Sequence, residues 1–183
     1  RASESVSYGS NAAGSTATVM ASNAQYTYGF DGWYNGSTRV STSVTYAPTN
    51  ITGAVTLEAR GTRTTKSYTV SPSAYYRNTD GTGNYTAGTT GGTVSGGGSV
   101  NHGGSITVTA SAAAGYKFDG WYSAGATGGS LLSSSASYAI SGVTASMTVY
   151  ARFTKKYYTI TYSAGDYVAS LSRTSERVAH GAN

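Results

Sequence analysis

A five-residue segment that occurs twice restricts the possible folds of this chain more than any other feature. Phe-Asp-Gly-Trp-Tyr stands at residues 30–34 and again at residues 118–122, 88 residues later. Residues 55–60 resemble residues 147–152, now 92 residues later. The change in spacing predicts a four-residue insertion in the second copy, near residues 125–130. Matching segments in the same order predict two folding units of the same kind.

The flanking segments extend the repeat on both sides. Residues 14–22 parallel residues 104–111, and the basic turn and strand at residues 66–70 parallel residues 156–160. We therefore predict one complete unit from about residue 66 to residue 154. The expected division has three segments: residues 1–64 as a first module without its opening strand, residues 65–155 as a complete second module, and residues 156–183 as the opening strand of a third module or a donor strand for the next subunit.

The composition favours strands. Thr, Tyr, Val and Ile prefer strands, whereas the straight-chain residues that prefer helices are scarce. The chain of 183 residues has 17 tyrosines, whose apolar ring and polar hydroxyl suit a half-buried sheet surface. Alternation places Ile106 and Val108 on one face of a strand, and glycine and asparagine supply the turns. We predict an all-β fold.

The repeated aromatic segment predicts two core anchors in each unit. Phe118 and Trp121 are three positions apart, so in a regular strand the two rings would point to opposite faces. A bulge at Asp119-Gly120 would bring both rings to one face. We therefore expect Phe30, Trp33, Phe118 and Trp121 to be structural core anchors. The competing interpretation is an exposed aromatic platform that binds sugar.

Few residues carry the chemistry of an enzyme or a metal site. The chain has no cysteine, seven acidic residues and two histidines, which excludes disulfides, thiolate metal sites and cysteine nucleophiles. We interpret His102 and His180 as turn residues, and we expect the carboxylates of Asp31 and Asp119 to bind nearby backbone N–H groups. We expect no catalytic residue, no metal and no cofactor. The basic residues are scattered, which argues against nucleic acid, and no apolar stretch is long enough for a membrane span.

Two segments resemble a known repeat family. Gly-Tyr-Lys-Phe-Asp-Gly-Trp-Tyr at residues 115–122, followed by residues 137–153, resembles the divergent internalin B-type repeat, related to the Listeria–Bacteroides repeat. The resemblance implies compact β-grasp-like or sandwich-like modules in tandem on bacterial or archaeal surface proteins, where they serve as stalks or adhesive modules. It carries no catalytic motif. The first copy departs from the pattern at residues 25–28 and lacks the opening strand.

The last residues of the chain repeat an opening strand. A new opening strand at residues 157–163 is followed by an end that aligns with the segment at residues 101–104, with His180 matching His102, so the tail supplies what the first unit lacks. Two explanations remain open: a window cut from a longer tandem array, or a tail that adds to the open edge of the next subunit and builds a filament. The expected subunit-linking strand consists of Tyr157, Tyr158, Thr159, Ile160, Thr161 and Tyr162.

These observations predict a non-enzymatic extracellular structural or adhesion protein of the cell surface. Its repeats would form a surface stalk or a head-to-tail filament by strand complementation. The expected partners are copies of the chain or neighbouring repeats, with surface glycans or host and matrix material as further candidates. The alternative is a carbohydrate-binding adhesin module that uses exposed tyrosines such as Tyr75, Tyr76 and Tyr85.

Overall fold

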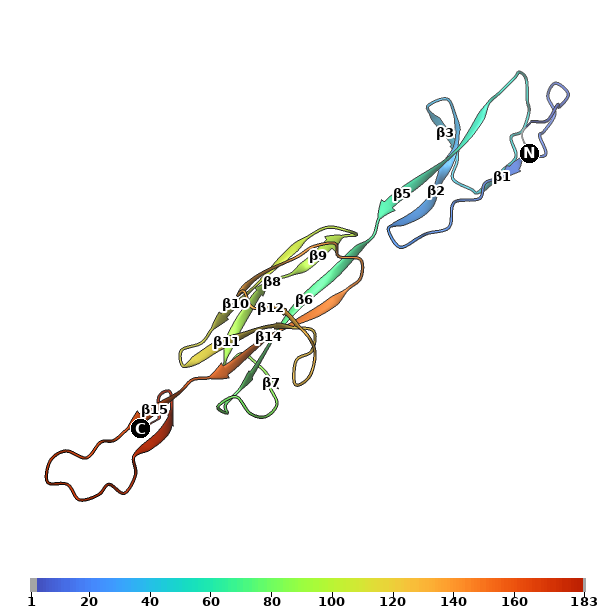
Figure 1. Ribbon diagram of the computed structural model, residues 1–183. Helices are drawn as coiled ribbons and strands as arrows, with labels where there is room; N and C mark the ends of the chain where they lie inside the picture. The colour runs from blue at the N-terminus through green and yellow to red at the C-terminus, as the bar shows by residue number, and fades with distance from the viewer. Residues whose placement is uncertain (1–2, 183) are drawn as a thin grey trace. The chain divides into compact units, whose positions relative to one another are not determined.

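The structure is a computed structural model that describes residues 3–182. Regular structure in these residues consists of strands alone (Figure 1), so the predicted all-β fold is confirmed. They contain no helix that could cross a membrane. The chain forms two compact units, residues 1–66 (unit 1) and residues 67–183 (unit 2). The further division expected at residue 155 stays a prediction, and its outermost residues 1, 2 and 183 lie outside the described part.

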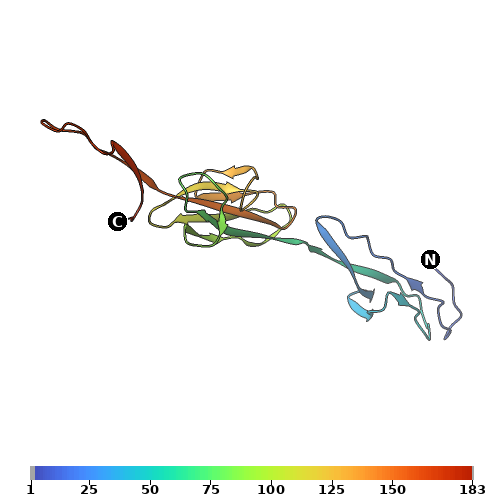
Figure 2. The ribbon, with the colours of Figure 1, turned by 90° about the horizontal axis from the view of Figure 1, so that it is seen from below.

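Unit 2 contains three sheets, and two of them enclose its core. The larger sheet has the order β12-β11-β14-β6-β7, with β9 also paired to β6. Its strands are β6 (Ser67–Arg77), β7 (Thr86–Ala87), β9 (Gly98–Asn101), β11 (Tyr116–Tyr122), β12 (Leu131–Ser133) and β14 (Met147–Lys155). The smaller sheet contains β8 (Gly92–Gly96), β10 (Ile106–Ala112) and β13 (Ser137–Ile140). Strand β14 is central because β11 pairs with it antiparallel and β6 pairs with it parallel (Figures 1 and 2).

The core of unit 2 lies between these sheets. Alternation along β14 turns Val149, Ala151 and Phe153 inward, and all three are fully buried. Val108 of β10 and Trp121 of β11 are also fully buried. Each large apolar side chain contributes about 1.5–3 kcal/mol when it leaves water. Unit 2 therefore has a continuous core of its own.

Unit 1 repeats one part of this architecture. Strands β3, β2 and β5 form a three-stranded sheet, and β1 pairs with β4. The bounds are β1 (Ser15–Thr16), β2 (Tyr26–Asn35), β3 (Thr38–Ser41), β4 (Thr45–Tyr46) and β5 (Leu57–Thr65). By pairing, they correspond to β10, β11, β12, β13 and β14. Among the described residues of unit 1, Trp33 is the only buried apolar side chain.

Both units share the register around tryptophan. Trp33 lies opposite Ala59, and Trp121 lies opposite Ala151. In each unit the register shifts at the aspartate between the phenylalanine and the glycine, so the expected bulge is present in both units. On their other side the tryptophans face Ser41 and Ser133, which are 92 residues apart. The predicted four-residue insertion is confirmed.

One predicted equivalence is wrong by three residues. The similarity of residues 14–22 to residues 104–111 aligns Ser15 with Ser105, but Ser15 pairs with Tyr46 as Val108 pairs with Tyr138. The register follows the tryptophan, whose indole N–H donates to a carbonyl next to β4 or β13 in the two units, at 3.3 and 3.2 Å. Polar Ser15 therefore occupies the position of Val108, a residue that is fully buried in unit 2.

Candidate functional site

The pair β6–β14 shows what a complete repeat contains. Eight residues of β6, from Val70 to Arg77, run parallel to Met147–Thr154 of β14. Strand β9 then pairs with the start of β6. The segment that precedes β10, residues 67–101, thus pairs along the edge of β14 that the later strands leave open. We call it the closing segment.

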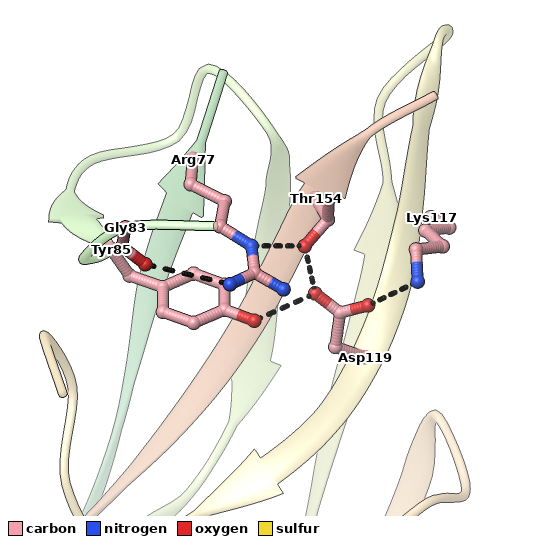
Figure 3. Close-up of polar contacts among 6 residues, drawn as sticks. All are labelled: Arg77, Gly83, Tyr85, Lys117, Asp119 and Thr154. Carbon is pink, nitrogen blue, oxygen red and sulfur yellow. Dashed lines mark hydrogen bonds and ion pairs between the residues drawn. The ribbon is translucent and has the colours of Figure 1, made fainter. Parts of the chain in front are cut away.

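A polar network fastens the end of this closing segment (Figure 3). It joins six residues: Arg77, Gly83, Tyr85, Lys117, Asp119 and Thr154. Asp119 is central, since it accepts hydrogen bonds from the hydroxyls of Tyr85, at 3.0 Å, and Thr154, and pairs with the Lys117 ammonium at 3.1 Å. The Arg77 guanidinium donates to the Thr154 hydroxyl at 2.9 Å. Residues on β6 and its following loop are thereby tied to β11 and β14.

The centre of the network is shielded from water. The Asp119 side chain is only 11% exposed, and burial raises the pKa of the Tyr85 hydroxyl, an effect to which the Asp119 charge adds. Asp119 was expected to bind backbone N–H groups, but its partners in the structure are side chains. Asp31 at the same position in unit 1 also has side-chain partners, Tyr34 at 2.5 Å and Arg39 at 3.3 Å. These contacts describe a structural role.

Strand β5 of unit 1 has no such closing segment. It pairs with β2 along one edge, and no other strand in the described part of unit 1 lies along its second edge. The equivalent edge of β14 carries β6. A row of main-chain N–H and C=O groups on an open edge can accept another strand. We call this second edge of β5 the acceptor edge.

Two grooves in unit 1 border β5, which we call the acceptor strand. One has a volume of about 710 Å³, and its lining includes Trp33, Val55 and Leu57. The other has a volume of about 300 Å³, and its lining includes Phe30 and Gly61. In unit 2 the corresponding space is filled, with Val149 at the position of Leu57 and Phe153 at that of Gly61. Unit 1 is hollow where unit 2 has its core.

The last strands of the chain repeat the start of the closing segment. Strands β15 (Tyr157–Thr161) and β16 (Ser175–Ala179) pair antiparallel, with Tyr158 opposite Val178. In β6–β9, Tyr68 lies opposite Val100 in the same way. The tyrosine ring lies tilted beside a histidine ring in both hairpins: Tyr68 beside His102 at 5.9 Å, and Tyr158 beside His180 at 6.1 Å. We call residues 157–179 the donor hairpin.

The donor hairpin exposes the side chains that its counterpart buries. Ile160 occupies the position of fully buried Val70, yet it is 41% exposed. Of the six residues expected to link subunits, Tyr157 is half-buried and donates a hydrogen bond to the Asn78 carbonyl at 2.6 Å. The other five are exposed: Tyr158, Thr159, Ile160, Thr161 and Tyr162.

The four expected core anchors face into their units. Phe30 and Trp33 are in edge contact at 6.3 Å, and Phe118 and Trp121 at 6.1 Å. Trp121 is fully buried and Trp33 is 8% exposed, while both phenylalanines are half-buried. This placement leaves no aromatic platform at either tryptophan.

The tyrosines of the alternative interpretation are not exposed as expected. All three are half-buried. Tyr75 packs edge-on against Tyr150 at 5.4 Å, and Tyr76 against Tyr116 at 6.4 Å. Tyr85 belongs to the Asp119 network. All three rings therefore make contacts within unit 2.

Metal chemistry has little to build on in the described residues. They contain no group of three or more His, Asp or Glu side chains that could hold a metal ion. His102 and His180 each lie beside a tyrosine ring in separate hairpins.

Two family models match the chain. Residues 81–157 match the Divergent InlB B-repeat domain, and residues 2–60 match the Listeria-Bacteroides repeat domain. Each of the two units is therefore similar to a repeat of this kind. Such repeats are generally non-catalytic structural modules and typically occur in surface or extracellular proteins. No curated protein and no solved structure matched the chain.

Proposed function

We propose that this chain is a non-enzymatic structural protein of the cell surface whose repeats join end to end by strand complementation. The donor hairpin of one copy adds to the acceptor edge of a second copy. One observation carries the proposal: unit 2 contains a parallel β6–β14 pair, whereas unit 1 holds only the counterpart of β14 and the donor hairpin only that of β6.

The β6–β14 pair also defines the register of the proposed contact. Pro72 lies opposite Val149 in unit 2. Tyr162 holds the position of Pro72 and Leu57 that of Val149, so Tyr162 is expected beside Leu57. In the same register Ile160 enters the groove of about 710 Å³ near Val55.

The physical chemistry favours this contact. The docked strand would supply main-chain hydrogen bonds to an edge that lacks them. Ile160, Tyr158 and Tyr162 would leave water together, at about 1.5–3 kcal/mol for a fully buried aliphatic or aromatic side chain. Association itself costs about 4–15 kcal/mol, so several such side chains are needed. The donor hairpin offers them on one short strand.

Paired cysteines test the register directly. The natural chain has no cysteine, so Leu57→Cys and Tyr162→Cys can be made in separate proteins that differ in a tag. When these are mixed under mild oxidation, we expect a mixed disulfide between two copies, because neighbouring strands bring Cα atoms within the required 4.4–6.8 Å.

The matched control replaces Tyr162→Cys with Thr161→Cys. Thr161 lies one residue away, and its side chain points to the opposite face of the strand. The proposal expects little mixed disulfide from this pair. Equal yields from both pairs, or a protein that sediments as a monomer at every concentration, would refute it.

Electron microscopy shows what the contact builds. Copy-to-copy complementation predicts long fibres of uniform width from the wild-type protein. The same contact between successive repeats of one longer chain would build a stalk instead. Short isolated rods from the 183-residue protein would contradict the filament.

A further inference from the structure

The Phe153 side chain of unit 2 packs against two glycines. Its ring lies on β14 under β8, and the chain there is Gly91-Gly92. A Cβ atom on Gly92 would lie 2.6 Å from the Phe153 ring, and one on Gly91 would lie 2.8 Å from the Phe153 Cβ. These Cβ atoms would also lie 2.5 Å from the Tyr76 Cβ and from the Ser111 carbonyl oxygen, so Phe153 is one of the neighbours that require small residues on the closing segment.

Unit 1 has a small residue on the acceptor strand where unit 2 has Phe153. Phe118 lies opposite Phe153, whereas Phe30 lies opposite Gly61. Gly61 lines the groove of about 300 Å³ together with Phe30, Val19 and Met20. Val19 and Met20 are exposed there. The position filled by a phenyl ring in unit 2 is empty in unit 1.

The donor hairpin differs from the closing segment in the connection between its two strands. In unit 2, residues 78–97 connect β6 to β9 and contain Gly91-Gly92. In the donor hairpin, residues 162–174 connect β15 to β16. This shorter connection carries two aliphatic side chains, Val168 and Leu171, which are 50% and 37% exposed.

We propose that Val168 and Leu171 of one copy fill the hollow that Gly61 leaves in unit 1 of another copy. This inference rests on the proposed strand complementation and adds its specificity determinant. The pair is size-reversed: unit 2 sets a large acceptor residue against small closing residues, and the copy-to-copy contact sets a small acceptor residue against large closing ones. Protein interiors tolerate neither voids nor overlaps.

The size reversal would keep the two closing segments apart. The donor hairpin would overlap with Phe153 if it invaded unit 2. Conversely, a glycine-bearing segment such as residues 67–101 would leave a void if it docked on unit 1. Discrimination by steric mismatch is a common source of specificity.

A cycle of substitutions tests the size-reversed pair. Gly61→Phe alone should create an overlap, and Val168→Gly with Leu171→Gly alone should create a void. We expect each change to weaken assembly about tenfold or more, read from the protein concentration at which half the chains sediment as oligomers. All three substitutions in one chain recreate the unit 2 pair and should restore assembly to within about threefold of wild type.

Two controls separate packing from folding and flexibility. A Cβ on residue 61 approaches the Gly29 carbonyl oxygen to 3.0 Å, so Gly61→Ala measures that crowding without filling the hollow. Ala169→Gly with Ser172→Gly adds the same chain flexibility to the donor connection while keeping both aliphatic side chains. We expect both controls to assemble nearly as well as wild type.

The outcomes distinguish this inference from the proposed function. If wild type forms the Leu57→Cys and Tyr162→Cys disulfide but the triple variant is as weak as the weaker single change, the size-reversed pair is wrong and strand complementation stands. If the donor-side glycines leave assembly unchanged, the pair is also wrong. If wild type does not assemble at all, the proposed function and this inference both fail.

Discussion

Arg152 shows how one residue type can do different work in two copies of a repeat. Its guanidinium is buried, donates to the carbonyls of Ala124, Gly125 and Gly128 at 2.6–2.9 Å, and lies 4.2 Å from the Tyr122 ring. Arg60 at the same position in unit 1 keeps the tyrosine contact at 4.2 Å, but it binds one carbonyl and is exposed to solvent. The four-residue insertion supplies the additional carbonyls.

The two arginines predict unequal costs of substitution. Arg152→Ala should destabilise unit 2 by about 3 kcal/mol, because it leaves the buried Gly125 carbonyl and two partly buried hydrogen bonds without their donor. Arg60→Ala should cost under about 1 kcal/mol, because its polar partners can bind water. The measurement is urea unfolding followed by tryptophan fluorescence, with Trp33→Phe used to read unit 2 and Trp121→Phe used to read unit 1. Equal losses from both substitutions would contradict the burial of Arg152.

Tyr85 predicts a loss of stability at high pH. Burial raises its pKa in the folded state, so the stabilisation is complete below the ordinary tyrosine pKa and declines as the pH rises above that value toward the raised one. Ultraviolet absorbance should show a tyrosine that ionises late in the folded protein. The pKa values of Tyr34, Tyr116 and Tyr162 are also raised, so Tyr85→Phe should lower the amplitude of the late titration by one tyrosine. If the variant keeps the full amplitude, the assignment is wrong.

At the scale of elements, the same strand has different neighbours in the two units. Strand β14 lies between β11 and β6. Four successive residues, from Ala151 to Thr154, are buried, so both faces of the strand are covered there. Strand β5 has β2 alone in the described part of unit 1, and none of its residues is buried. A missing neighbour therefore removes both hydrogen bonds and burial.

We predict that the donor hairpin loses stability at low pH. The hydrogen bond from the Tyr162 hydroxyl lowers the pKa of Glu176, which also pairs with Arg173. The stabilisation is therefore complete above the ordinary glutamate pKa and is lost as the pH falls through the lowered one. Nuclear magnetic resonance shifts of the Tyr162 ring should report this step. Glu176→Gln should abolish it, and a step that persists in the variant would refute the assignment.

At the scale of the whole molecule, one unit is complete and the other is not. Unit 2 buries a continuous cluster of apolar side chains, whereas unit 1 buries only Trp33 among its described residues. The proposed assembly would complete unit 1 with material from another copy. Stability of unit 1 should then depend on protein concentration.

Each unit contains one of the two tryptophans, which allows separate unfolding curves. In dilute protein, Trp33 (in a Trp121→Phe background) should report unfolding at a lower urea concentration than Trp121 does. Raising the protein concentration should shift the Trp33 curve upward and leave the Trp121 curve unchanged. A Trp33 curve that does not move would argue against complementation.

The amino-acid sequence by itself determined the repeat, the all-β class, the bulge before each tryptophan and the insertion near residues 125–130. These features depend on spacing, alternation and turn residues, which are local properties of a chain. Gly61 could also have been noticed, since the 92-residue spacing that matches residues 55–60 to residues 147–152 continues to Gly61 and Phe153.

Only the tertiary structure decided which edges are closed. The alignment of Ser15 with Ser105 failed because register follows pairing with distant strands rather than similarity of neighbouring residues. The Asp119 network and the packing of Tyr75 could not be read from sequence, because their partners lie far along the chain and meet only when β6, β11 and β14 assemble. Burial and edge pairing are collective properties of several strands, so they exist only in the folded molecule.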